Sequence, residues 1–181
     1  MKLGVICDGI SRDLSHALQV MGEFGLDYAE LQFVWDKEVG DHDASEIAQI
    51  KELLDTHNKP VSCLSRHIFA GLTTASKAGD KDHTRHMDYL KCVIEMAHQL
   101  NCPLVRIMTS KKEQILWGTN GAEHWNVAKG AWDTLPPLIA PAVDLARTEG
   151  VTLVVETGNG TMVNSCLLYT SDAADDSLGG G

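Results

Sequence analysis

The chain has 181 residues, a formal net charge of −10 at pH 7 and 44% hydrophobic residues, as expected for one globular domain with a real core. No run of basic residues exceeds the pair Lys111-Lys112, and nucleic-acid binding needs a clustered basic face. No apolar stretch approaches the roughly 18 residues of a membrane span, and the amino terminus does not resemble a signal peptide. We therefore expect a cytoplasmic protein that binds neither nucleic acid nor membrane.

Strand and helix patterns alternate from the start of the chain. Leu3–Cys7 predicts a first strand, and Asp13 can cap the helix that follows it. Gly25 stands just past the end of that helix, where C-terminal glycines are common, and Tyr28–Val34 predicts a second strand. The apolar face of the helix consists of Leu14, Ala17, Leu18, Met21 and Phe24.

The middle of the chain repeats this order. Asp43 and Glu46 have capping-box spacing and predict the start of a second helix. Pro60–Ser65 predicts the third strand, residues 73–82 form a long polar loop, and Pro103–Met108 predicts the fourth strand. The helix between these two strands turns inward Leu90, Val93, Ile94, Ala97 and Leu100.

A last repeat closes the series. A long loop containing Trp117 and His124 leads to a helix at about Trp132–Glu149, for which Pro141 predicts a kink. The apolar run Val151–Val155 then predicts a fifth strand, buried on both faces.

This alternation predicts an α/β fold with a parallel sheet and right-handed crossovers, either an open doubly wound sheet or a (β/α)8 barrel. The first strand-to-helix turn, Cys7–Ser11, lacks the G-x-G-x-x-G pattern of dinucleotide-binding sheets. The longest loops follow the third and fourth strands at their carboxyl ends, as barrel active-site loops do. Eight strand–helix units of this length, about 33 residues each, would match the ~250 residues of a typical barrel. We therefore predict a (β/α)8 TIM barrel truncated after the fifth strand.

The last sixteen residues show no strand or helix periodicity. The stretch Cys166–Asp175 resembles the translation of a transposon-end adapter used in DNA sequencing libraries. We therefore predict a partial barrel domain at residues 1–165 and a non-native, disordered tail at residues 166–181. The remaining cysteines contain no C-x-x-C pair, so we expect buried, reduced thiols of a cytosolic protein at Cys7, Cys63, Cys92 and Cys102.

Glu156 is the leading candidate for a functional residue, because it ends the apolar fifth strand and precedes a Gly/Asn turn. Burying a carboxylate there is costly unless it is paired or binds a metal, and ligands of α/β folds sit at the carboxyl ends of strands. A metal ligand, a salt-bridged structural carboxylate and an ordinary loop acid are the three interpretations.

Three passages resemble the xylose isomerase-like TIM barrel superfamily, in particular its sugar phosphate isomerase/epimerase branch. Gly25–Leu31 resembles the family's second strand with its terminal acid, and Ala97–Ile107 resembles the passage into its fourth strand. Ala146–Thr157 resembles the fifth-strand passage, whose terminal glutamate is a metal ligand. The order and spacing of the three passages carry the resemblance over nearly all of residues 1–165.

The resemblance implies a divalent metal ion, Mn, Mg, Co or Zn, with Glu156 as ligand and catalytic acid/base and the other ligands on strands six to eight. The implied function is a sugar or sugar phosphate isomerase/epimerase, which moves a proton next to a carbonyl through a metal-stabilised enediolate. Alternatives are an inositol-ketone dehydratase, an apurinic-type endonuclease and a non-catalytic sugar-binding barrel. The expected partners are a small sugar substrate and further copies of the chain. We expect the truncated chain itself to be inactive and to self-associate.

Four further residues are candidates for substrate binding on the strands and the loop after strand four. Glu30 near the end of strand two has either this role or a structural ion pair. His67 just after strand three is a mouth-lining polar group, a metal ligand as in apurinic endonucleases, or a surface histidine. Arg106 inside strand four is expected to pair with Glu30 or Glu156, or to contact substrate. Trp117 could cover a sugar ring or pack in the core of its loop.

Two other features complete the candidate set. Asn159, just beyond Glu156, could hydrogen-bond a substrate hydroxyl or shape the turn. His83 and His86 have a spacing that could hold a metal ion, but they open a polar helix turn, so we expect a solvated face there.

Overall fold

Five parallel strands form one sheet in this computed structural model, which describes residues 1–73, 75–111, 121–157 and 161. The order across the sheet is β1-β2-β5-β6-β7, so strands that follow one another through a helix are neighbours in space. In a doubly wound sheet, strands are added on both sides of the first strand. Here each new strand is added on the same side, so β1 lies at one edge of the sheet. The strands are β1 (Gly4–Ile6), β2 (Tyr28–Leu31), β5 (Val61–Ser65), β6 (Leu104–Ile107) and β7 (Thr152–Val155).

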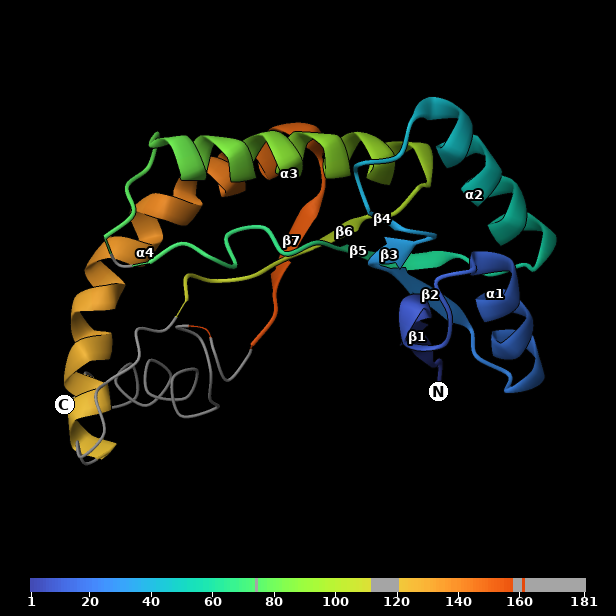
Figure 1. The fold of residues 1–181 in the computed structure, drawn as a ribbon, viewed down its shortest axis with the longest axis horizontal. Coiled ribbons are helices and arrows are strands. Elements are labelled where there is room, and N and C mark those ends of the chain that lie inside the picture. Colours follow the sequence, from blue (N-terminus) through green and yellow to red (C-terminus); the bar gives the residue numbers. More distant parts are fainter. Residues whose placement is uncertain (74, 112–120, 158–160, 162–181) are drawn as a thin grey trace, which may run out of the picture.

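The helices form an arc around the outside of the strands (Figure 1). They are α1 (Leu14–Glu23), α2 (Ala44–Thr56), α3 (Lys81–Gln99) and α4 (Gly121–Glu149), with a short 3-10 turn, η1 (Cys7–Gly9), after β1. Sequential parallel strands with helices on one face are the arrangement of a TIM barrel, so the predicted fold class, a truncated barrel, is confirmed. Within the described part of the chain, no helix is long and apolar enough to cross a membrane.

Each of the four helices ends in the same way before its strand begins. A residue with positive φ follows the C-cap of α1, α2 and α3, with 66° at Gly25, 51° at Asn58 and 53° at Asn101, and Gly150, directly after α4, has φ 71°. The next amide then bonds back to the helix, as Leu26 N does to Met21 O at 2.9 Å. Glycine and asparagine tolerate this left-handed conformation, so the sequence itself selects the sharp turn from helix into strand.

The helix starts agree with the sequence for α1 and α2. The Asp13 carboxylate accepts hydrogen bonds from the amides of Ser15 and His16, and Asp43 forms a full capping box with Glu46. These caps satisfy amides that have no partner inside the helix and fix where it begins.

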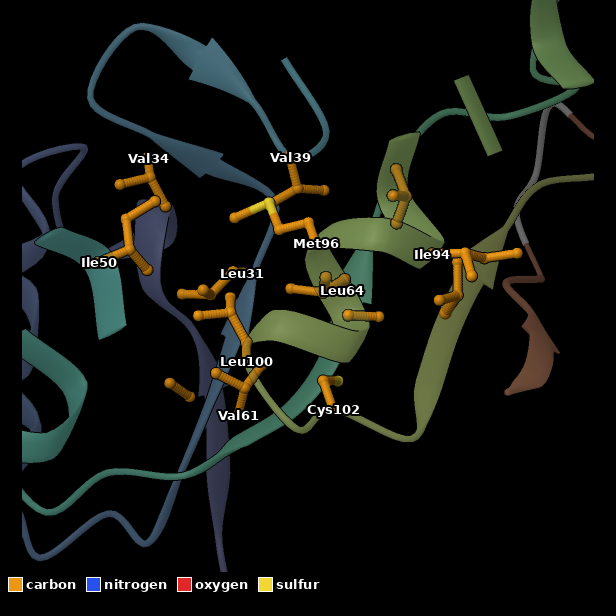
Figure 2. Close-up of a cluster of buried hydrophobic side chains, with 14 of the residues drawn as sticks. Leu31, Val34, Val39, Ile50, Val61, Leu64, Ile94, Met96, Leu100 and Cys102 are labelled. Carbon is orange, nitrogen blue, oxygen red and sulfur yellow. The ribbon is translucent and has the colours of Figure 1, made fainter. Parts of the chain in front are cut away.

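The hydrophobic core lies between the sheet and the helices. Alternate strand residues turn toward the helices and are fully buried, namely Ala29, Leu31, Leu64, Val105 and Ile107. In Figure 2, Leu31 and Leu64 from neighbouring strands lie close to Met96 and Leu100 of the α3 region. Val39 and Ile50 belong to the same cluster. The opposite face of the sheet carries the polar side chains of Glu30, Ser65 and Arg106 together with Cys63 and Val154.

The structure corrects several sequence predictions. The predicted strand Tyr28–Val34 is divided at Gln32, and its end forms a hairpin of β3 (Phe33–Val34) with β4 (Lys37–Glu38) across a two-residue turn. Trp35 in that turn has φ 55°. Phe24 was predicted on the inward face of α1, but it is the C-cap and is 77% exposed.

The last helix and one thiol also differ from the predictions. α4 begins at Gly121 rather than near Trp132, so His124 lies in a helix and not in a loop. Its Pro141 lies inside the helix, as predicted, together with Pro136 and Pro137. Cys92 is an exposed thiol on α3, whereas Cys7, Cys63 and Cys102 are free and buried as expected.

Candidate functional site

A row of polar side chains crosses the face of the sheet that the helices leave open. Ser65, Arg106 and Val154 are partners in register on β5, β6 and β7. Because side chains alternate along a strand, Glu156, two residues beyond Val154, turns to the same face. The pairing continues to that point, since Glu156 N donates to Ile107 O at 3.0 Å.

Glu156 and Arg106 form an ion pair on this face. Arg106 Nη1 meets Glu156 Oε2; the Arg106 side chain is 10% exposed and the Glu156 side chain is 41% exposed. Arg106 thus pairs with one of its two predicted partners. The Glu156 side chain stands at the carboxyl end of β7 and is partly exposed, although its Oε2 atom is buried, while the guanidinium lies deeper in the sheet. This geometry leaves Glu156 accessible to a ligand from the open end of the strands.

Arg106 retains hydrogen-bonding capacity beyond this pair. Its Nε and Nη2 atoms are buried and have no hydrogen-bond partner among the described residues. A buried guanidinium normally uses its five N–H groups, so these donors are available to a substrate oxygen or to another part of the protein. The prediction that Arg106 binds substrate stays a prediction.

Glu30 lies on the same open face but is not part of this ion pair. It accepts a hydrogen bond from the hydroxyl of Ser65, which joins β2 to β5. No ion pair of Glu30 is found in the part of the chain that the structure describes, so the structural ion pair expected for it is not seen there. Cys63 lies beside this group, and burial raises the pKa of its thiol to about 11, which keeps it protonated and a poor nucleophile.

His67 stands where the chain leaves β5 and is held by a carboxylate. Its Nδ1 is 2.9 Å from Glu38 Oε1, and its backbone N–H donates to the same oxygen at 3.1 Å. The side chain of His67 is 48% exposed and that of Glu38 is 18% exposed. Gln32, just after β2, places its amide nitrogen 3.1 Å from His67 Nε2. His67 therefore stands just beyond the carboxyl end of β5 beside Glu38 and Gln32, and its role in lining a substrate site stays a prediction.

Arg66 fixes the hairpin that carries Glu38. Its Nη1 donates to Val39 O at 2.6 Å and to Asp41 Oδ1 at 2.8 Å, and its Nη2 donates to Asp41 Oδ2 at 3.1 Å. The guanidinium also lies 4.3 Å from the centroid of the Tyr89 ring on α3. The β3–β4 hairpin is thus clamped between the end of β5 and α3.

Sequence reasoning did not single out Glu38, Gln32 or Arg66. The two-residue gap between Phe33–Val34 and Lys37–Glu38 is a hairpin spacing, but it lacks the Asn-Gly or Asp-Gly signal that marks such turns. The alternation of strand residues beyond Glu30 could have indicated that Gln32 faces the open side.

The two histidines on α3 are not the solvated face that the sequence predicts. His83 is 3% exposed; its Nδ1 accepts from Gly79 N at 3.2 Å, and its Nε2 lies 2.8 Å from Leu138 O. His86 Nδ1 accepts from Phe69 N at 3.1 Å, and burial lowers the pKa of His86. Both rings therefore join α3 to neighbouring segments.

Two predicted site residues, Trp117 and Asn159, lie outside the described residues, as does the side chain of His124. In the described ranges, no group of three or more His, Cys, Asp or Glu side chains could hold a metal ion. A single carboxylate, Glu156, has the oxygen chemistry that Mg, Mn and Zn accept and stands at an accessible strand end. The described part therefore contains no group of three ligands for the predicted metal site, and Glu156 stays its predicted ligand.

The family of the chain follows from a comparison with family models. The model of the xylose isomerase-like TIM barrel family matches residues 18–177. The chain belongs to this family, which confirms the resemblance seen in the sequence. No curated protein sequence matches the chain.

Solved structures with the same fold include sugar epimerases. The 3-keto-D-glucoside 4-epimerase of E. coli shares 13% identity at a TM-score of 0.58, over 98% of this chain and 64% of that structure. The D-allulose 3-epimerase of a Methylomonas species in complex with D-allulose shares 15% identity at a TM-score of 0.58, over 97% and 58%. The IOLI protein with a zinc atom shares 20% identity at a TM-score of 0.61, over 98% and 59%. The chain thus spans less than two thirds of each, and identities this low show the fold alone.

Proposed function

We propose that this chain is part of a metal-dependent isomerase or epimerase that acts on a small sugar or sugar phosphate. The observation that carries the proposal is the Glu156 side chain. It is partly exposed at the carboxyl end of β7 and forms an ion pair with the buried guanidinium of Arg106. Ligands of TIM barrels bind at this end of the strands. The family membership and the sugar epimerases among similar structures favour this class.

Glu156 would act as the base that removes a proton from a carbon next to a carbonyl group. A base must be ionised to accept a proton, and the Glu156 carboxylate stands beside the guanidinium of Arg106. A divalent cation, when bound, would supply positive charge for the oxygen beside that carbon. Glu156 would be one ligand of the cation, and the remaining ligands would come from outside the described residues.

Arg106, Glu30 and His67 would line the substrate side of the site. The two buried donors of Arg106 suit a substrate oxygen, and the Glu30 carboxylate suits a hydroxyl, because each has unused capacity of the right kind. Trp117 and Asn159 stay predictions for the same site.

The test uses the whole protein of which we propose this chain to be a part, expressed as one polypeptide. We would incubate it in D2O with a divalent cation and each of the four D-2-ketohexoses, and measure deuterium entry next to the carbonyl by NMR. Wild-type protein should exchange this proton, Glu156→Gln should lose the exchange at least 100-fold, and Glu149→Gln should match wild type. Exchange that survives Glu156→Gln, or no exchange by the wild type, would contradict the proposal.

A further inference from the structure

Two histidines near the start of α3 accept hydrogen bonds from the loop that joins β5 to α3. His86 Nδ1 accepts from the backbone amide of Phe69 at 3.1 Å, and His83 Nδ1 accepts from the backbone amide of Gly79 at 3.2 Å. A ring nitrogen can accept a hydrogen bond only while it carries no proton, and both nitrogens carry one in the charged ring. Both hydrogen bonds therefore require neutral imidazole rings.

The amide that His86 holds belongs to a strained turn. Phe69 has φ 68°, a left-handed backbone conformation that is costly for a residue with a bulky side chain. Its ring is buried and stacks on the His83 ring, with centroids 5.6 Å apart and an angle of 15° between the planes. The amides of Gly71 and Leu72 donate to Phe69 O at 2.9 Å and 3.1 Å. The strained residue is thus the centre of the turn at residues 67–72.

The two histidine rings differ in their surroundings. His83 is 3% exposed, its Nε2 lies 2.8 Å from Leu138 O, and its backbone amide donates to Asp80 at 2.8 Å. Because its Nδ1 is an acceptor, its one proton is on Nε2 and donates to that carbonyl. His86 is only half-buried, and the ring of Tyr89, a titratable neighbour, lies 6.0 Å from it between centroids. A proton from solvent therefore reaches His86 more easily than His83.

The environment of His86 keeps its ring neutral at pH 7. Burial has the largest effect and lowers the pKa of His86. The positive charges of Arg85 on α3 and Arg66 after β5 act in the same direction, as does His83 when it is charged, whereas Asp82 on α3 opposes them. The ring consequently takes up a proton only at a pH below about 6.5, the ordinary value for histidine.

We propose that protonation of His86 releases the turn at residues 67–72 from α3, which makes this turn a pH-sensitive element of the fold. In the charged ring Nδ1 carries a hydrogen, so two donors face each other where Phe69 N–H met an acceptor. The left-handed turn then loses the hydrogen bond that offsets its strain. The inference goes beyond the proposed function and does not depend on it, because it concerns the conformation of the loop.

The test is amide hydrogen exchange of the ¹⁵N-labelled chain, followed by NMR at about pH 7.5 and about pH 5. Exchange is expressed as a protection factor, so the chemical dependence of exchange on pH cancels. The protection factor of the Phe69 amide should fall about tenfold or more at the lower pH. The Leu26 amide, which bonds to Met21 O at 2.9 Å, is the reference and should change less than about twofold. The ¹⁵N shifts of His86 should titrate with the same midpoint as the loss at Phe69.

Three variants separate the proton from the packing. His86→Asn retains an acceptor oxygen near the position of Nδ1 but cannot titrate, so it should protect the Phe69 amide equally at both pH values. His86→Phe retains a ring without an acceptor, so this amide should lose protection at both. His16→Asn replaces an exposed histidine on α1 and should behave as the wild type.

Three outcomes would overturn the inference. One is a wild-type Phe69 amide that is unprotected near pH 7.5 or equally protected at both pH values. Another is an equal loss at Leu26, which would report unfolding of the whole chain. The third is a loss that persists in His86→Asn, which would assign the titration to another group. If His86→Phe does not fold, the comparison of wild type with His86→Asn still decides.

Discussion

The two ends of the Arg106–Glu156 pair differ in burial, and this predicts unequal costs when each end is removed. The Arg106 side chain is 10% exposed and the Glu156 side chain is 41% exposed. Glu156→Met leaves a guanidinium buried without a counter-charge, whereas Arg106→Met leaves a carboxylate that can turn into water. The first change should therefore destabilise the fold more than the second.

The magnitudes follow from the burial of each partner. Removing one partner of a buried ion pair costs about 3–5 kcal/mol, and partial exposure of Glu156 places Glu156→Met near the lower end, about 3 kcal/mol. Arg106→Met should cost about 1 kcal/mol, because the remaining carboxylate is screened by solvent. The double variant should recover most of the loss, since a buried pair replaced by apolar groups of similar size is often neutral.

Urea unfolding followed by circular dichroism measures these differences. With an m-value of about 2 kcal/mol/M, the midpoint of Glu156→Met should lie about 1 M below that of Arg106→Met. Arg147→Met and Asp144→Met break an exposed pair on α4 and serve as controls with unchanged midpoints. Equal midpoints for the two test variants, a reversed order, or no recovery in the double variant would refute the reasoning.

Three further predictions concern thiols, pH and the core. Cys92 should react with a thiol reagent in the native chain at pH 8, and Cys92→Ser should remove one reactive equivalent. Burial raises the pKa of Cys7 to about 12, so its thiol should react only after unfolding. Burial lowers the pKa of His86, so the unfolded chain takes up this proton first as pH falls. The free energy of unfolding should therefore be highest above about pH 6.5 and should decrease as the pH falls below this value. In a pH series of urea titrations, His86→Asn should make this decrease smaller. Leu64→Ala, at a fully buried position against the helices, should lower the free energy of unfolding by about 2–5 kcal/mol in the same assay, and a loss below 1 kcal/mol would contradict the packing described here.

Local interactions explain why the sequence predicts so much of the fold. Asp13 and Asp43 bond to amides two or three residues away, and Gly25 needs only its own backbone conformation to end a helix. The alternation of strands and helices then restricts the topology, because parallel neighbours require right-handed crossovers. The helix caps and helix ends depend on contacts between residues a few positions apart, so the sequence alone can predict them.

The site depends on contacts between distant segments, and here the sequence leaves choices open. The sequence pattern places Arg106 inside a strand and Glu156 at the end of the next one. Only the register of β6 with β7 decides that Arg106 meets Glu156 and not Glu30. The β3–β4 hairpin brings Glu38 to His67 across 29 residues, without a turn motif that would announce it.

Burial of polar groups is decided in the same way. His83 has charged neighbours in sequence and was expected on a solvated face, but α4 packs over it and offers the carbonyl of Leu138. The sequence by itself determined the elements, their caps and the class of sheet, because each of these arises within a few residues. The tertiary structure decided which polar side chains meet, because strand register and helix packing set distances between residues that are far apart in the chain.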